Sequence, residues 1–529
     1  ICVGGVRSRA CAERLLAKPY QLYVIAGFPM DKLPAKIQYL ILKQVAQGAG
    51  LLCCGPGASD YLAPKRLLTP TPSPLVAGLP TLGDKTPAQL VSAYRLGKGR
   101  GVWLNYGASA LVPAPEFGWR GLTDLDYWML LVGRAALWAA SREGEVSVTS
   151  VLGGKSLAVK QADARTIAEV VVSSNAAKPI QATVTLDLRR ASDGLKTNLP
   201  ERKATLTAGQ ASRLPVELPR LRAGDYFLDV VVKSKRGVEA CGAGAFTVES
   251  DFGVDRAAMD KSFVERGDAI KGTAFLRGTP PADAVLRVRL RDSYDRILKQ
   301  QELKVAPGQT EYPFEYRPDA FATIEMRAEA VLLAGGQDVA LKDTSFTVPK
   351  RRQNQFNFVM WDAGMDVLGY YAWRKMQEAG YNVCLIGSLG GQRKQPAVLR
   401  ACDASIAPYS TRILDPKDEK GHMQPVCWND DPAATNYVQG IVDNQKLLRE
   451  QGVFGYSLGD EGVTKGCCVH PACLAAYRRY LAAQYGTVEK LNASWGTTSK
   501  SFDEVDLLDR TDNMENAAAK TCFPRWYDR

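Results

Sequence analysis

Two groups of side chains in the C-terminal third of the sequence have the types and spacing to do chemistry. Asp460 and Glu461 are adjacent carboxylates that directly follow the apolar run 453–458. Four cysteines lie close together in the sequence, at Cys427, Cys467, Cys468 and Cys473. A positioned carboxylic acid can transfer protons to and from a reacting group. Clustered thiols with short spacings favour a bound metal over a disulfide framework.

The carboxylate pair is positioned by the strand that precedes it. From residue 355 the pattern predicts four βα units, with strands at 356–361, 382–386, 404–409 and 453–458 and helices at 365–379, 396–402 and 433–451. Four consecutive units fit either a doubly wound sheet or half of a (β/α)8 barrel. In a barrel, Glu461 would lie at the carboxyl end of the fourth strand, where barrel enzymes hold their catalytic groups. The spacing alone is equally consistent with a second interpretation, in which the two carboxylates are simply the polar start of an exposed loop.

The rest of the chain is predicted to form three further domains. Residues 1–145 alternate short apolar strands with helices, which predicts a parallel α/β sheet. Residues 146–249 and 250–349 contain alternating apolar and polar runs without a helical pattern, so each is predicted to be an immunoglobulin-like β-sandwich. These two sandwiches could bind carbohydrate, although spacer or packing modules suit the pattern better.

Composition indicates an ordinary globular protein, because 46% of the 529 residues are hydrophobic and 23% are charged. The formal net charge is +11, but the basic runs 233–236 and 350–352 are short and indicate solvated turns and linkers, with no nucleic-acid partner. The sequence has no apolar run long enough to span a membrane. Both ends interrupt a domain pattern, so we expect the sequence to be a fragment in which a signal peptide would be hidden.

The C-terminal segment resembles family 42 β-galactosidases over roughly residues 355–529. The stretch after Glu461 shares with that family a cysteine cluster, an amphipathic helix and the short motifs Tyr485-Gly-Thr487, Leu491-Asn492 and Trp495-Gly-Thr497. Its sequence is CCVHPACLAAYRRYLAAQYGTVEKLNASWGTTSKSFDEV. Upstream, VCWNDDPAATNYVQGIV resembles the family's segment before the helix that leads to strand four. The resemblance implies that residues 350–529 are the N-terminal half of a (β/α)8 TIM barrel.

The same resemblance implies roles for the two carboxylates. Glu461 matches the family's general acid/base, and the family's nucleophile is a Glu near the end of strand seven. The barrel clan normally has Asn before the acid, where it hydrogen-bonds the sugar 2-hydroxyl, but this sequence has Asp460. A carboxylate cannot donate an amide hydrogen, and it places a like charge beside Glu461. The sequence ends before strand seven, so we expect the fragment itself to lack the nucleophile and to be inactive.

The cysteines match positions at which members of this family often bind a structural zinc with four thiolates. Cys427 matches the first ligand and Cys473 the last. Cys467, Cys468 and His470 compete for the two places between them, because the spacing is altered. A structural zinc takes four nitrogen or sulfur ligands and leaves no position open. Such a zinc would hold the loop of Glu461 without taking part in catalysis, and the alternative is reduced cysteines or one disulfide.

Further side chains near the predicted strand ends are candidates for sugar contact. Trp361 and Asp362 follow strand one, Arg412 follows strand three, and Trp428 lies near the mouth of the expected barrel. Aromatic faces stack on the apolar faces of sugars, and an Arg can bind a hydroxyl. Core or rim tryptophans and an ordinary surface charge are the competing interpretations.

Residues 1–145 resemble the class I glutamine-amidotransferase-like fold that large glycosidases use as an accessory domain. The matching segments are YVIAGFPMDKLPAKIQYLILKQVAQGAGLLCCG and YWMLLVGRAALWAASRE. An active amidotransferase needs a nucleophilic Cys with a His and a Glu, whereas the two histidines, His422 and His470, lie far away in this sequence. We therefore expect this domain to be structural, or to contribute to a site or to a homo-oligomer.

Together the patterns predict a retaining glycoside hydrolase of the β-galactosidase type, which would act on terminal β-galactosides or related glycosides with Glu461 as acid/base. The alternative is a non-catalytic carbohydrate-binding or scaffold protein built from the same modules, which Asp460 in place of Asn favours. An exported location, periplasmic or extracellular, would suit an enzyme of polysaccharide breakdown.

Overall fold

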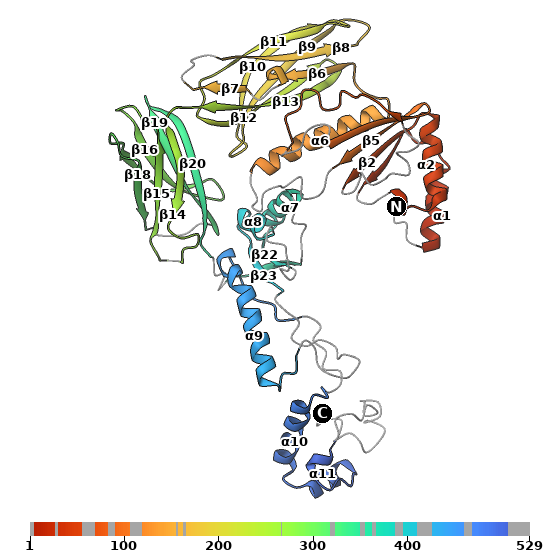
Figure 1. Ribbon diagram of the computed structural model, residues 1–529, viewed down its shortest axis with the longest axis vertical. Helices are drawn as coiled ribbons and strands as arrows, with labels where there is room; N and C mark the ends of the chain where they lie inside the picture. Colours follow the sequence, from red (N-terminus) through yellow and green to blue (C-terminus); the bar gives the residue numbers. More distant parts are fainter. Residues whose placement is uncertain are drawn as a thin grey trace.

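The computed structural model describes residues 5–26, 30–55, 69–82, 90–105, 119–154, 157–161, 166–265, 267–317, 323–349, 355–361, 367–386, 395–409, 426–459 and 468–505. An α/β region comes first, two β modules follow, and a second α/β region with a helical extension comes last (Figure 1). The coarse prediction of a multidomain chain that mixes α/β and β structure is therefore confirmed. The assignments to amidotransferase-like, immunoglobulin-like and barrel folds stay predictions.

The N-terminal region is built on one five-stranded sheet of order β1-β2-β5-β4-β3. Its parallel part consists of β1 (Leu22–Ala26), β2 (Gly50–Gly55) and β5 (Gly99–Asn105). The other edge is antiparallel and consists of β4 (Val91–Leu96) and β3 (Thr69–Pro70). The sheet is mixed, so the prediction of a parallel sheet was wrong for this edge. β4 is only partly buried, and it therefore lacks the continuous apolar run by which a buried parallel strand is recognised.

Helices cover this sheet: α1 (Gly5–Leu16), α2 (Ala35–Gln47) and α6 (Trp119–Ala139). The α2 helix buries Ile37, Ile41 and Val45, whose spacing of four residues places them on one face. It ends at Gly48, which has φ 127°, a backbone angle that disfavours residues with a Cβ. The η1 turn (Met30–Lys32) precedes α2.

The first β module pairs a five-stranded sheet of order β10-β9-β12-β13-β7 with a three-stranded sheet of order β11-β8-β6. The strands are β6 (Val146–Val151), β7 (Leu157–Lys160), β8 (Thr166–Ser174), β9 (Ile180–Arg190), β10 (Lys196–Leu206), β11 (Ala211–Leu218), β12 (Gly224–Ser234) and β13 (Gly237–Glu249). Buried residues of both sheets form one core, as in two sheets packed face to face.

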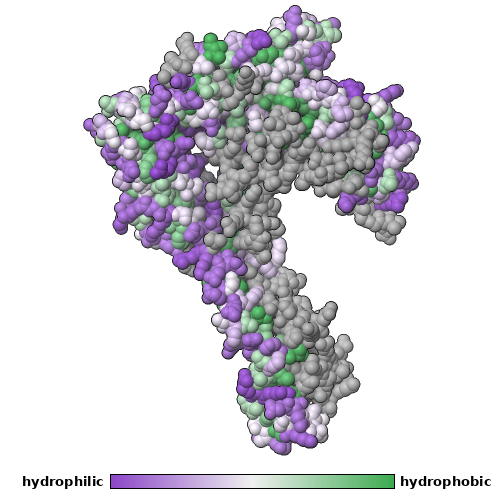
Figure 2. Space-filling model, in the orientation of Figure 1, coloured by the Kyte–Doolittle hydropathy of each residue, from purple (hydrophilic) through white to green (hydrophobic). Residues whose placement is uncertain are grey.

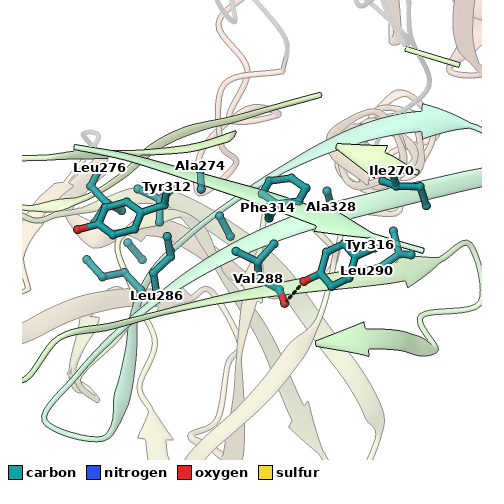
Figure 3. Close-up of a cluster of buried hydrophobic side chains, with 14 of the residues drawn as sticks. Ile270, Ala274, Leu276, Leu286, Val288, Leu290, Tyr312, Phe314, Tyr316 and Ala328 are labelled. Carbon is teal, nitrogen blue, oxygen red and sulfur yellow. Dashed lines mark hydrogen bonds between the residues drawn. The ribbon is translucent and has the colours of Figure 1, made fainter. Parts of the chain in front are cut away.

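The second β module repeats this arrangement with sheets of order β14-β15-β18 and β17-β16-β19-β20. Its strands are β14 (Gly253–Met259), β15 (Ile270–Arg277), β16 (Val285–Asp292), β17 (Ile297–Lys304), β18 (Glu311–Tyr316), β19 (Glu325–Ala334) and β20 (Gln337–Thr347). In the core, the Tyr316 hydroxyl donates to the Val288 carbonyl oxygen at 2.6 Å (Figure 3). Hydrophilic side chains cover much of the module's outer surface, at the left of Figure 2, as the alternating strands require.

Polar side chains of α6 join the N-terminal region to the first β module. The Arg134 guanidinium donates to the carbonyl oxygens of Leu75, Ala77 and Cys241. The Tyr127 hydroxyl donates to an Asp229 carboxylate oxygen at 2.6 Å. Because burial lowers the pKa of Arg134 and raises that of Tyr127, both groups depend on these partners to offset the loss of water.

The second α/β region begins with three parallel strands in sequential order, β21 (Phe358–Trp361), β22 (Tyr381–Ile386) and β23 (Ser405–Pro408). The helices between them are α7 (Val367–Glu378) and α8 (Gln395–Ala401), close to their predicted positions. Trp373 of α7 and Leu399 of α8 are fully buried in a core with Cys384 and Ile406 of the sheet.

The fourth predicted strand, 453–458, does not form a regular strand. It makes two isolated parallel bridges, Val453 with Ile406 and Ser457 with Tyr409. Four residue steps separate Val453 from Ser457, but only three separate Ile406 from Tyr409. The extra residue interrupts the ladder in the way that a β-bulge does. The segment is nevertheless parallel to β23 and beside it, in the place where the fourth strand was expected.

The helical extension contains α9 (Asp431–Gln445), η4 (Lys446–Gln451), α10 (Pro471–Tyr485), α11 (Val488–Trp495) and η5 (Phe502–Glu504). Its helices α10 and α11 lie far from the β modules (Figure 1). Its last part has a small core of its own, Leu481, Leu491, Trp495 and Val505. None of the helices in the described ranges is long and apolar enough to cross a membrane.

The second β module contacts the second α/β region close to β23. Asp403, two residues before β23, accepts the buried Ile324 N–H at 2.8 Å, and Thr347 donates to the Glu450 carbonyl oxygen. Gly452, with φ 79°, has no room for a Cβ, which would lie 2.9 Å from the Ile324 side chain. Contacts on Ile324 therefore fix the chain at two points, Asp403 before β23 and Gly452 before the 453–459 segment.

Asp403→Ala should weaken this junction, because it leaves the buried Ile324 N–H without an acceptor. The expected cost is about 1–3 kcal/mol, which would speed hydrogen exchange of the Ile324 amide by about fivefold to 150-fold. Asp403→Asn keeps an oxygen acceptor and tolerates the left-handed backbone at this position, so it should change exchange little. Equal protection in all three proteins would show that the hydrogen bond contributes nothing.

Candidate functional site

The carboxyl ends of β21, β22 and β23 meet at one edge of the sheet. At this edge the Tyr409 N–H donates to the Ile386 carbonyl oxygen and the Ser457 N–H to the Pro408 carbonyl oxygen, each at 2.9 Å. Ser457 is followed by the end of the described segment at residue 459. The two residues expected to carry chemistry, Asp460 and Glu461, therefore follow a segment that is tied to the end of β23.

Several predicted site residues lie outside the described residues. These are Glu461, Asp460, Asp362, Arg412 and Cys467. Trp428 is described and partly buried, and its ring packs edge-on against Tyr437 of α9 with a centroid distance of 6.0 Å. Sugar contact by Trp428 stays a prediction.

Three cysteines come together at the start of α10. The Sγ atoms of Cys427, Cys468 and Cys473 all lie within 4.8 Å of one another. Cys427 and Cys468 are buried, and Cys427 Sγ lies 3.2 Å from Cys473 Sγ, which is too long for a disulfide bond. Burial raises the pKa of Cys473 to about 12, against the hydrogen bond that Asn429 donates to its sulfur. A cation that binds thiolates would reverse this preference for the neutral thiol.

His470 has a different position from the three cysteines. It is the N-cap of α10, and its Nδ1 accepts the Ala472 N–H at 3.3 Å. Its Nε2 lies 3.7 Å from an Asp430 carboxylate oxygen. Asp430 is in turn the N-cap of α9 and accepts the Ala433 N–H. His470 thus connects the two helix starts and is not part of the group of sulfur ligands among the described residues.

Tyr409 is a site residue that the sequence analysis missed. Its ring lies 6.2 Å from the Trp361 ring, centroid to centroid, with an interplanar angle of 64°. The signal was available, because Tyr409 ends the third predicted strand in the same position that Trp361 has in the first. What the sequence did not show is that the two side chains reach each other across β22.

The sequence relationships bear on the segment that contains Glu461 and the cysteines. Residues 415–528 match the glycoside hydrolase family 42 model, described as beta-galactosidase. This match supports a glycoside hydrolase of the β-galactosidase type and includes Glu461, Cys427 and Cys473. It covers the C-terminal part of the chain only.

Other comparisons add little. A search of curated proteins found no match. Among solved structures, the crystal structure of red sea bream transglutaminase aligns with a TM-score of 0.21 and 11% identity. The alignment covers 41% of this chain and 34% of the transglutaminase chain, so it spans about a third of that protein. Similarity at this level carries no argument about fold or function.

Proposed function

We propose that residues 350–529 are the N-terminal half of the catalytic barrel of a retaining β-galactosidase-type glycoside hydrolase. The family match over residues 415–528 carries this proposal. The strand order supports it, because β21, β22, β23 and the 453–457 segment neighbour one another in sequential order. In a barrel, successive strands are neighbours in this way, whereas in a doubly wound sheet the order of the strands reverses at a switch point.

In the proposed reaction Glu461 is the acid/base residue. It protonates the glycosidic oxygen while a second carboxylate attacks the anomeric carbon and forms a covalent glycosyl-enzyme. The C–O bond to the leaving group breaks in this step. Glu461 then takes a proton from water, which displaces the carboxylate and releases the sugar with retained configuration. The nucleophile would come from a later strand of the complete barrel.

The remaining candidate side chains would bind the substrate. Asp460 would accept a hydrogen bond from a sugar hydroxyl next to the reacting carbon. Asp362 and Arg412 would follow the first and third strands at the same edge, and Trp428 would contribute from the rim. Terminal β-galactosides or related glycosides are the proposed substrates.

A zinc ion bound by the cysteine cluster would be structural. Tetrahedral Zn–S bonds of about 2.3 Å place the sulfurs about 3.8 Å apart, and the three described Sγ atoms lie within 4.8 Å of one another. The fourth ligand would be Cys467 and not His470, because neither ring nitrogen of His470 belongs to the group of ligand atoms that lie within 4.8 Å of one another. The zinc would then tie together the two ends of the stretch that contains Glu461.

The N-terminal modules would support the barrel and not catalyse. The N-terminal region would be an amidotransferase-like accessory domain, and residues 146–249 and 250–349 would be immunoglobulin-like spacers. The second of these already holds the sheet through Asp403 and Glu450. A non-catalytic carbohydrate-binding protein is the second candidate, which Asp460 in place of the clan's Asn favours.

Hydrolysis of methyl β-D-galactopyranoside and aryl β-galactosides by the full-length protein tests the proposal. Proton NMR of the first product should show the β anomer, because a retaining mechanism preserves configuration. Initial release of the α anomer would exclude the retaining mechanism. Binding of galactosides without any hydrolysis would support the binding protein instead.

A further inference from the structure

An aromatic pair lies at the carboxyl edge of the parallel sheet. Trp361 is the last residue of β21, and Tyr409 directly follows β23. Their rings meet edge to face, with centroids 6.2 Å apart and an interplanar angle of 64°. An edge-to-face pair leaves at least one aromatic ring face uncovered by the partner. Trp361 is 61% exposed, so it presents a large apolar surface at the position where barrel enzymes bind their substrates.

Strand alternation shows on which side of the sheet the pair lies. Cys384 and Ile406 are paired across β22 and β23 and belong to the core that the helices cover. Leu385 is the next residue of β22 and pairs with Trp361 on one side and with Ala407 on the other. Because successive side chains point to opposite faces, Trp361 and Tyr409 lie on the face away from α7 and α8. This is the face that lines the interior of a barrel.

The Tyr409 hydroxyl adds a polar group to this aromatic surface. Its oxygen is buried and has no hydrogen-bond partner among the residues that the structure describes. A buried hydroxyl without a partner is unfavourable, and such groups in native proteins call for an explanation, such as a bound water or a ligand. A sugar hydroxyl could act as its donor or acceptor. Trp361, Leu385, Tyr409 and Ser457 carry no charge, which suits a neutral ligand.

We propose that Trp361 and Tyr409 form the sugar-stacking subsite for a neutral pyranoside next to the Glu461 segment. The apolar face of the pyranose ring would lie on the indole, and one sugar hydroxyl would hydrogen-bond to Tyr409. Ser457, which is bridged to Tyr409, would lie at the same edge of the sheet as this subsite. This subsite rests on the proposed function and specifies where its substrate binds.

Saturation-transfer NMR and calorimetry of the full chain with methyl β-D-galactopyranoside test the subsite. Trp361→Ala should weaken binding by about tenfold or more, equivalent to about 1.4 kcal/mol. Tyr409→Phe keeps the ring but removes the hydroxyl, and it should weaken binding by about threefold to tenfold. Phe356→Ala is the matched control, because Phe356 is an exposed aromatic residue that precedes the amino end of the same strand. It should bind the glycoside like the unmodified chain.

Several results would overturn the subsite. These are unchanged affinity of Trp361→Ala, absence of binding by the unmodified chain at millimolar concentrations, and equal binding of D-glucitol, which has hydroxyls but no ring face. A change in oligomeric state of Trp361→Ala without a change in sugar affinity would identify the pair as a contact between protein chains. Failure of the proposed function is a separate outcome. A full-length Glu461→Gln protein that still hydrolyses galactosides would exclude the acid role while the Trp361 binding data stand.

Discussion

Glu461→Gln in the full-length protein should lower kcat for a β-galactoside with a poor leaving group by about a hundredfold to ten-thousandfold. Such a factor is what a positioned proton donor contributes to a reaction. Gln has nearly the same shape as Glu but cannot give up a proton, so the fold should not change. Glu461 follows a segment that is bridged to the end of β23, and the carboxyl ends of barrel strands are where barrel enzymes hold their catalytic groups.

The leaving group provides an internal control for this result. A 2,4-dinitrophenyl galactoside departs without protonation, so its first chemical step should be far less sensitive to Glu461→Gln than that of the methyl glycoside. Glu450→Gln is a matched variant, because Glu450 lies on the same connection but contributes its backbone carbonyl to the junction with Thr347. It should retain activity on both substrates. Equal losses on the two substrates would argue that Glu461 has a structural role and is not the acid.

Removal of zinc should have the second large effect, and the effect should be local. The purified chain is expected to hold about one zinc ion, and a chelator should unfold residues 426–505 while the β modules stay folded. Apparent binding free energies of structural zinc are about 10–16 kcal/mol in small domains. The described side chains of α9 include no buried residue, and those of α10 include only Leu481. Apart from the small core of Leu481, Leu491, Trp495 and Val505, these helices have few buried side chains with which to replace the metal.

Hydrogen exchange measured by mass spectrometry with and without chelator checks the locality of this effect. Cys427→Ser should lose the metal and increase exchange in residues 426–505, but not in β12 or β19. His470→Asn is the matched control, because Asn also caps helices well and should keep the zinc. If His470→Asn lost the zinc and Cys467→Ser kept it, the fourth ligand would be His470 and not Cys467. Absence of zinc, with fewer than the 12 thiols of the sequence titrating, would indicate a disulfide instead.

Local structure followed from the sequence wherever one periodic pattern decided it. The helices α7 and α8 and the strand β22 lie within a few residues of their predicted positions, because their burial depends on spacing along the chain. β4 was missed because a half-buried strand without regular alternation of buried and exposed residues gives no strong period. The 453–458 segment was predicted as a strand, but the extra residue between its two bridges breaks the ladder.

By itself the sequence determined the motifs around Glu461 that resemble the family and the spacing of the cysteines. It also determined the alternation of apolar and polar residues that distinguishes the β modules from the α/β regions. Tertiary structure decided which of these residues meet. It brought Trp361 to Tyr409 across β22, placed three sulfurs together while His470 capped a helix, and tied Asp403 to Ile324. These contacts join residues that are far apart in the chain. The sequence could not predict them, because the periodicity of apolar residues indicates only which face of a helix or strand a residue occupies. Partners across a sheet or between modules depend on register and packing, which form only when the whole region folds.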